Sequence, residues 1–156
     1  MNEMTSAQAI ARLTKRPPVG ATELLASEPL EIDAVLGRAR IAYLGKPEFC
    51  NEHGFIHGGF LSAMLDEVMA IAATAPRNFD YVVPTLGMKT SFLQPVEPGR
   101  LIAEGSIVQI STQAGARAMD GTRAREVYLA GELFNGAGEL AATATATARF
   151  RKLPWK

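Results

Sequence analysis

The spacing of apolar residues predicts one long helix in the middle of the chain. Twelve of the sixteen residues from Phe60 to Ala75 are apolar, and they fall on all sides of a helix. A helix that is apolar all round is a buried helix. Pro76 is expected to end it, and the glycine pair Gly58-Gly59 stands directly before it.

Beyond this helix the apolar pattern changes to that of β-strands. Strands are expected over four ranges: Tyr81–Leu93, Leu101–Ser111, Thr122–Phe134 and Glu139–Phe150. Asn135-Gly136-Ala137-Gly138 predicts a hairpin between the last two. Threonine and alanine alternate from Ala142 to Ala148, so one face of that strand is lined with small residues. Such a face lets the buried helix pack closely.

The first part of the chain has weaker signals. Ser6–Arg16 reads as a short amphipathic helix ended by two prolines, and Thr22–Ala34 as an edge strand with its approach. Arg38–Leu44 alternates as a half-buried strand would, and Lys46–Phe55 is loop-like. We therefore expect an α+β fold in which a curved antiparallel sheet wraps one helix. Residues 1–20 would be a helical extension and residues 21–156 a single domain.

Composition narrows the class of protein. A chain of 156 residues with 47% apolar and 21% charged residues fits one globular domain. The formal net charge is zero, which argues against a nucleic-acid-binding protein. Cys50 is the only cysteine, so no disulfide forms within the chain. The first residues lack the pattern of a secretory signal, and the apolar segment is interrupted by Asp66 and Glu67. We expect a cytoplasmic protein with no membrane partner.

Two adjacent carboxylates, Asp66 and Glu67, lie within the apolar helix. Burying a carboxylate is costly unless it is paired, and a dry site raises its pKa into a range useful for acid–base chemistry. The alternative is that the helix has one wet edge where both side chains reach water.

The helix start is the second candidate for chemistry. Free N–H groups there attract negative charge, and Gly58 lets a ligand approach the backbone closely. A developing oxyanion would fit, although a tight turn without a ligand would use the same glycines. Asp66 follows Gly58 by eight residues, which is about 80° of rotation and about 12 Å along the axis. One chain would not bring both to one carbonyl, whereas a two-fold dimer could place Asp66 of one subunit opposite Gly58 of the other.

The pattern Asn51-(five residues)-His57-Gly58-Gly59-(six residues)-Asp66 resembles the motif of hotdog-fold thioesterases of the phenylacetic-acid-degradation type, which are related to 4-hydroxybenzoyl-CoA thioesterases. The stretch from Pro84 to Pro95 resembles the family's strand that follows the helix. The likeness extends loosely from Arg38 to Phe150.

The resemblance implies a role for each matching residue. Asp66 would be the general base or nucleophile, Gly58 the oxyanion donor, and Asn51 would hold the water or the carbonyl. Thr85 would orient the water, and His57 would shape the turn or bond near the thioester. Substrate contacts are expected at four further residues: Phe55, Gly59, Ser62 and Glu67. The family also implies an acyl-CoA substrate, no cofactor or metal, and a homodimer or a dimer-of-dimers tetramer.

Other features weigh less. The stretch from Thr112 to Gly121 is longer than the family's usual turn, and it would be a solvated loop or line the substrate entrance. Cys50 lacks the basic setting that activates a thiolate, and His53 with His57 lacks a third zinc ligand. Ser62 is not in a nucleophile-elbow context. A basic tail could meet the phosphates of coenzyme A, but a solvated end fits it as well; it comprises Arg149, Arg151, Lys152 and Lys156.

Hydrolysis of an acyl-CoA thioester is the function this pattern favours. A hotdog dehydratase or hydratase would need a catalytic histidine in another motif. A non-catalytic acyl-CoA-binding or sensor module on the same fold would have no need of Asp66. Phe55, Phe60 and Met64 suggest an apolar pocket, but they would serve equally as core, so the acyl group stays open.

Overall fold

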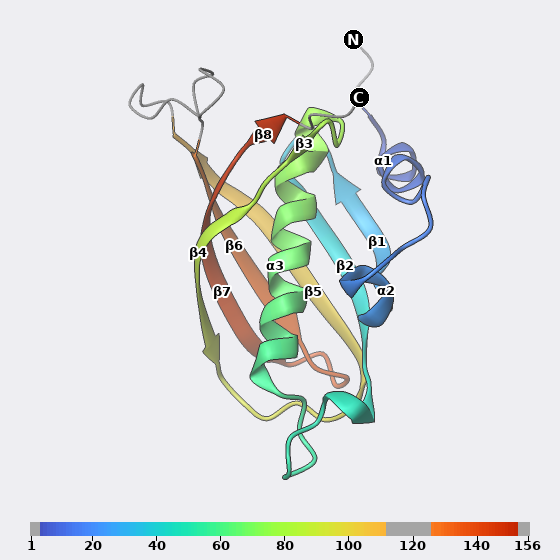
Figure 1. Cartoon of the computed structure of the whole chain (residues 1–156), viewed down its shortest axis with the longest axis vertical. Helices are drawn as coiled ribbons and strands as arrows, with labels where there is room; N and C mark the ends of the chain where they lie inside the picture. Colours follow the sequence, from blue (N-terminus) through green and yellow to red (C-terminus); the bar gives the residue numbers. More distant parts are fainter. Residues whose placement is uncertain (1–3, 112–125, 153–156) are drawn as a thin grey trace.

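A six-stranded antiparallel sheet curves around one long helix (Figure 1). The computed structural model describes residues 4–111 and 126–152. The sheet contains β1 (Glu28–Asp33), β2 (Arg38–Gly45), β4 (Thr85–Phe92), β5 (Gly99–Ile110), β6 (Glu126–Phe134) and β7 (Leu140–Arg149). Their spatial order is β1-β2-β5-β6-β7-β4, so β1 and β4 form the two edges. The arrangement confirms the expected α+β architecture.

Helix α3 (Gly58–Thr74) packs its apolar side into the curved sheet. Five of its core side chains are almost completely buried: Met64, Leu65, Val68, Met69 and Leu61. The prediction of a helix buried on all sides was wrong in one respect, because Gly59 and Ala63 are exposed and Asp66 and Glu67 are half-buried. The helix therefore has a wet edge, and Asp66 borders it. The carboxylate of Glu67 does not reach it, because one oxygen accepts from Thr22 and the other is buried.

The segment Gly58–Arg77 is long and apolar enough to cross a membrane by length and composition alone. The core helix of a soluble protein meets the same criterion. Here the apolar side chains of the helix pack against the sheet and form the core, which accounts for their number.

The helix lies close to the sheet because small residues face it. A Cβ atom on Gly105 of β5 would lie 2.6 Å from the carbonyl oxygen of Val68, so only glycine fits there. On β7 the inward face is the predicted run of alanines, and all four are buried: Ala142, Ala144, Ala146 and Ala148.

Two segments differ from the sequence-based expectation. The strand expected over Tyr81–Leu93 is divided: β3 (Tyr81–Val82) pairs with β8 (Arg151–Lys152) in a separate small sheet, and β4 starts only at Thr85. Pro84 lies at the break. Because proline has no N–H to donate to a neighbouring strand, it interrupts the hydrogen bonding of the sheet there. The approach to β1 contains an unpredicted short helix, α2 (Ala21–Leu24). The expected loop 112–121 and residues 122–125 lie outside the described residues.

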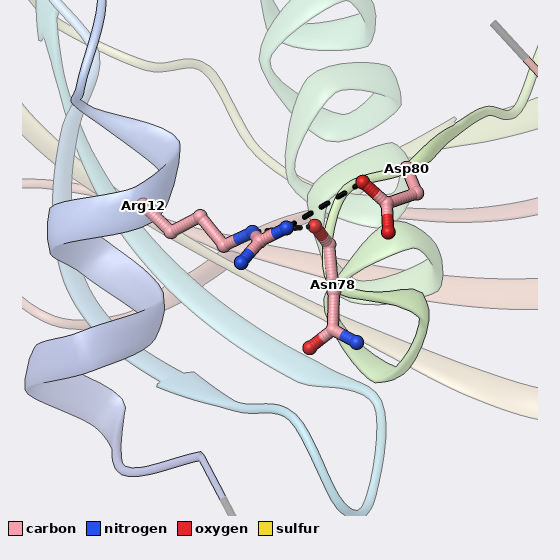
Figure 2. Close-up of polar contacts among 3 residues, drawn as sticks. All are labelled: Arg12, Asn78 and Asp80. Carbon is pink, nitrogen blue, oxygen red and sulfur yellow. Dashed lines mark hydrogen bonds and ion pairs between the residues drawn. The ribbon is translucent and has the colours of Figure 1, made fainter. Parts of the chain in front are cut away.

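The N-terminal helix α1 (Ser6–Leu13) packs against β1 and is attached to the far end of α3 (Figure 2). The Nε of Arg12 donates to the carbonyl oxygen of Asn78 at 2.8 Å, and its guanidinium lies 3.5 Å from Asp80. Asn78 and Phe79 follow the 3-10 turn η2 (Ala75–Arg77) with left-handed φ angles of 54° and 56°. Arg12 therefore supports an unusual corner of the backbone.

Candidate active site

His57 caps the N-terminus of α3. Its Nδ1 accepts the N–H of Gly59 at 3.0 Å, so this nitrogen carries no proton and is occupied. The contact places His57 in the turn, as one of its expected roles requires. It also commits the Gly59 N–H to the cap.

Gly58 is the first residue of the helix, and its N–H makes no hydrogen bond within the described part of the chain. The ring of Phe92, the last residue of β4, lies over it: a Cβ at position 58 would be 2.7 Å from the ring Cζ. Of the two glycines, Gly58 therefore offers the free donor, and Phe92 explains the absence of a side chain.

Asn51 lies in the loop between the 3-10 turn η1 (Pro47–Phe49) and α3. Its Oδ1 accepts the N–H groups of His53 and Phe55 at 2.9 and 3.2 Å, which closes the loop. The side-chain NH₂ has no partner among the described residues, so it is available as a second donor near the helix start.

An open groove of about 700 Å³ runs past this end of the helix. It lies between the loop before α3 and the segment that follows β4. Its lining includes three of the expected catalytic residues, Asn51, His57 and Gly58, and three of the expected substrate contacts: Phe55, Gly59 and Ser62. Its other walls are mainly apolar and include Leu61, Phe92, Leu93 and Val96.

Asp66 and Thr85 are brought together midway along the helix. The Thr85 hydroxyl, at the start of β4, donates to Asp66 Oδ1 at 2.6 Å. This contact joins residues 19 positions apart, and it brings two of the expected catalytic residues together. Neither residue lines the groove at the helix start.

Three side-chain contacts, two of them hydrogen bonds, connect α3 to the edge strand β4. Gly58 lies against Phe92, the Ser62 hydroxyl lies 3.2 Å from that of Thr90, and Asp66 meets Thr85. They lie one helical turn apart, and the strand runs in the opposite direction to the helix. The helix face with the candidate site residues therefore lies along an edge of the sheet.

Glu67 points to a different part of the molecule. Its Oε1 accepts the hydroxyl of Thr22 in α2 at 2.7 Å, and it lies beside Tyr43 on β2. Burial, and then the charge of Glu67, raise the pKa of the Tyr43 hydroxyl far above its usual value. Glu67 is not among the groove residues, and no local signal in the sequence revealed its partners.

The remaining candidates stay outside the groove. His53 is exposed and lies 3.4 Å from Glu52. Among residues 4–111 and 126–152 no group of three or more His, Cys, Asp or Glu side chains is placed to hold a metal ion. Arg149 of the basic tail is paired with Glu126 at 2.8 Å, whereas Lys156 lies outside the described residues.

Comparison with known proteins points to thioesterases. Residues 53–115, which include the histidine cap, the helix and β4, match the Thioesterase superfamily. No curated protein matches the chain by sequence.

Solved structures share the fold along most of the chain. A phenylacetic acid degradation-related protein from Ralstonia eutropha is 27% identical, with a TM-score of 0.73 over 95% of this chain and 99% of that one. A thioesterase from Haemophilus influenzae has a TM-score of 0.75 over 93% and 92% of the two chains at 14% identity. A mutant of the phenylacetic acid degradation protein PaaI from Thermus thermophilus is 23% identical, with a TM-score of 0.65 over 82% of this chain and 96% of that one. The last two likenesses are of fold alone.

The superfamily match covers the stretch that carries the helix start, Asp66 and Thr85, and the surrounding architecture is that of the related structures. The chain is therefore similar to the Thioesterase superfamily over residues 53–115 and has the fold of the phenylacetic acid degradation-related protein along nearly its whole length, and both likenesses support a thioester hydrolase.

Proposed function

We propose that the protein hydrolyses acyl-CoA thioesters, with Asp66 as the catalytic carboxylate and the Gly58 N–H as oxyanion donor. The free Gly58 N–H beside an apolar groove is the observation that supports this most directly. The groove would take the acyl group, and the NH₂ of Asn51 would be a second donor to the carbonyl oxygen.

The chemistry needs no cofactor. Asp66 would take a proton from water as the water oxygen attacks the thioester carbon, or would attack that carbon itself to form an anhydride that water then cleaves. The carbonyl oxygen becomes negative at the Gly58 N–H, and the carbonyl re-forms as the carbon–sulfur bond breaks. The departing sulfur of coenzyme A takes the proton that Asp66 removed from water, or a solvent proton in the anhydride route, and leaves as the thiol. Thr85 would hold one oxygen of Asp66 in place.

The site would be shared by two subunits. Within one chain Gly58 and Asp66 are about 12 Å apart along the helix, which is too far for one carbonyl. β4 is an open sheet edge, and antiparallel pairing of two β4 strands about their midpoints would set Phe92 opposite Thr85 of the partner subunit. Because Phe92 lies on Gly58 and Thr85 on Asp66, this pairing would bring Gly58 toward Asp66 of the partner subunit.

The proposal is tested by thiol release from a panel of aliphatic and aromatic acyl-CoA esters. Asp66→Asn keeps the size and the Thr85 contact but removes the base, and we expect kcat to fall by about 10²–10⁴-fold. Glu67→Gln, in the adjacent position but facing Tyr43, should change kcat by less than about tenfold.

Loss of activity in Glu67→Gln with retention in Asp66→Asn would show that the carboxylates have been assigned the wrong way round. Tight binding of acyl-CoA esters without any hydrolysis would instead identify a binding module. Far-UV circular dichroism of each variant shows that the fold is intact.

A further inference from the structure

Phe92 has an unusual position for a large apolar side chain. It ends the edge strand β4 and is 53% exposed, yet its ring tip is fitted against the backbone of Gly58. A Cβ on Gly58 would be 2.7 Å from Cζ and 3.1 Å from both Cε atoms. Phe92 thus lies against the residue whose backbone N–H is free at the start of the helix.

The rest of the groove has few polar groups free to select a ligand. The side-chain NH₂ of Gln94 donates to the carbonyl oxygen of Leu140 at 2.8 Å, and His57 Nδ1 accepts the N–H of Gly59 in the helix cap. Apart from Asn51, Ser62 and the two glycines, the remaining walls are apolar side chains, including Phe55, Leu61 and Val96. A groove of this kind binds hydrocarbon and orients it by one or two hydrogen bonds.

We propose that Phe92 is a specificity-determining residue that selects substrates by the shape of the acyl group next to the thioester carbonyl. This inference rests on the proposed function. A carbonyl oxygen bonded to the Gly58 N–H lies about 2.9 Å from that nitrogen. The first carbon of the acyl group must then pass the Phe92 ring tip, which lies against the same residue.

An unbranched CH₂ passes the ring, whereas a branch or an aryl ring attached directly to the carbonyl carbon meets it. The protein should therefore favour acyl groups with a CH₂ beside the carbonyl. The far end of the acyl group extends into the open part of the groove, where its length matters less.

Two matched substrate pairs test this: butyryl-CoA against isobutyryl-CoA, and phenylacetyl-CoA against benzoyl-CoA. The wild-type protein should favour the first of each pair by about tenfold or more in kcat/KM, since single-carbon steric differences discriminate by roughly 10–200-fold. Phe92→Ala should bring both kcat/KM ratios to within about threefold of one, because kcat/KM for the second substrate of each pair rises. Phe92→Leu, a milder change if the alanine variant does not fold, should give intermediate ratios.

Tyr128→Ala is the matched control, because Tyr128 is an aromatic side chain that is 40% exposed on β6, away from the β4 edge, and does not line the groove. It should keep the wild-type ratios. Unchanged ratios in both Phe92 variants, or a wild-type protein without a preference, would overturn the inference while leaving the hydrolase proposal intact. Failure of the wild-type protein to hydrolyse any of the esters would overturn the proposed function and this inference with it.

Discussion

Gly58→Pro tests the oxyanion donor directly. Proline at the first helical position is well accepted, because that N–H has no partner within the helix and the fixed φ suits a helix start. His57, the residue before it, has φ −61° and ψ 135°, which is the conformation that a following proline requires. The substitution therefore removes one N–H and leaves the helix in place.

The added side chain is a separate perturbation. A Cβ at position 58 meets the Phe92 ring at 2.7 Å, whereas ordinary contact begins at 3.4 Å, so the ring must move by about 0.7 Å. Phe92 is half exposed, and a displaced rotamer costs about 0.5–1.5 kcal/mol, which is at most about a tenfold effect on rate. Gly58→Ala has the same Cβ and keeps the N–H, so it measures this cost alone.

The assay is kcat for thiol release from the best acyl-CoA substrate, with circular dichroism and urea denaturation as checks of folding. Removal of one oxyanion donor costs about 10²–10³-fold in kcat, or about 2.7–4 kcal/mol. Gly58→Pro should therefore be slower than Gly58→Ala by about that factor. Equal kcat values in two folded variants would refute the assignment of the Gly58 N–H as the oxyanion donor.

Three further outcomes are expected. Mixing inactive Asp66→Asn and Gly58→Pro subunits should restore about one quarter of wild-type activity, because half of the dimers are mixed and each has one intact shared site; no recovery after verified exchange would place each site within one chain. Gly105→Ala should lower the free energy of unfolding by about 1–3 kcal/mol in urea titrations, whereas Gly87→Ala should change it little because a Cβ at position 87 meets open space. Similar losses of unfolding free energy in both variants would contradict the close approach of helix and sheet. The raised pKa of Tyr43 keeps the tyrosine protonated in the folded protein, whereas in the unfolded chain it ionises near pH 10, so the free energy of unfolding falls as pH rises above that value. Tyr43→Phe should reduce this fall by about 1.4 kcal/mol per pH unit, and equal slopes of unfolding free energy against pH in the two proteins would contradict the prediction.

The sequence by itself determined the elements whose signals are local. The apolar run of α3, the alternation in β2 and β7 and the Asn135–Gly138 hairpin each follow from spacing within one segment. The order of His57, Gly58 and Asp66 along one helix also identified both candidate groups, and helix geometry alone predicted that they lie too far apart for one carbonyl.

Tertiary structure decided what lies beside each of these elements. Thr85 reaches Asp66, and Phe92 covers Gly58, only because β4 runs along α3 at the sheet edge. Asp66 and Glu67 are adjacent in sequence, but about 100° of helical rotation turns one toward β4 and the other toward Tyr43. Contacts across tens of residues depend on how the sheet closes around the helix, and that closure is a property of the whole packed core, so no single segment encodes it.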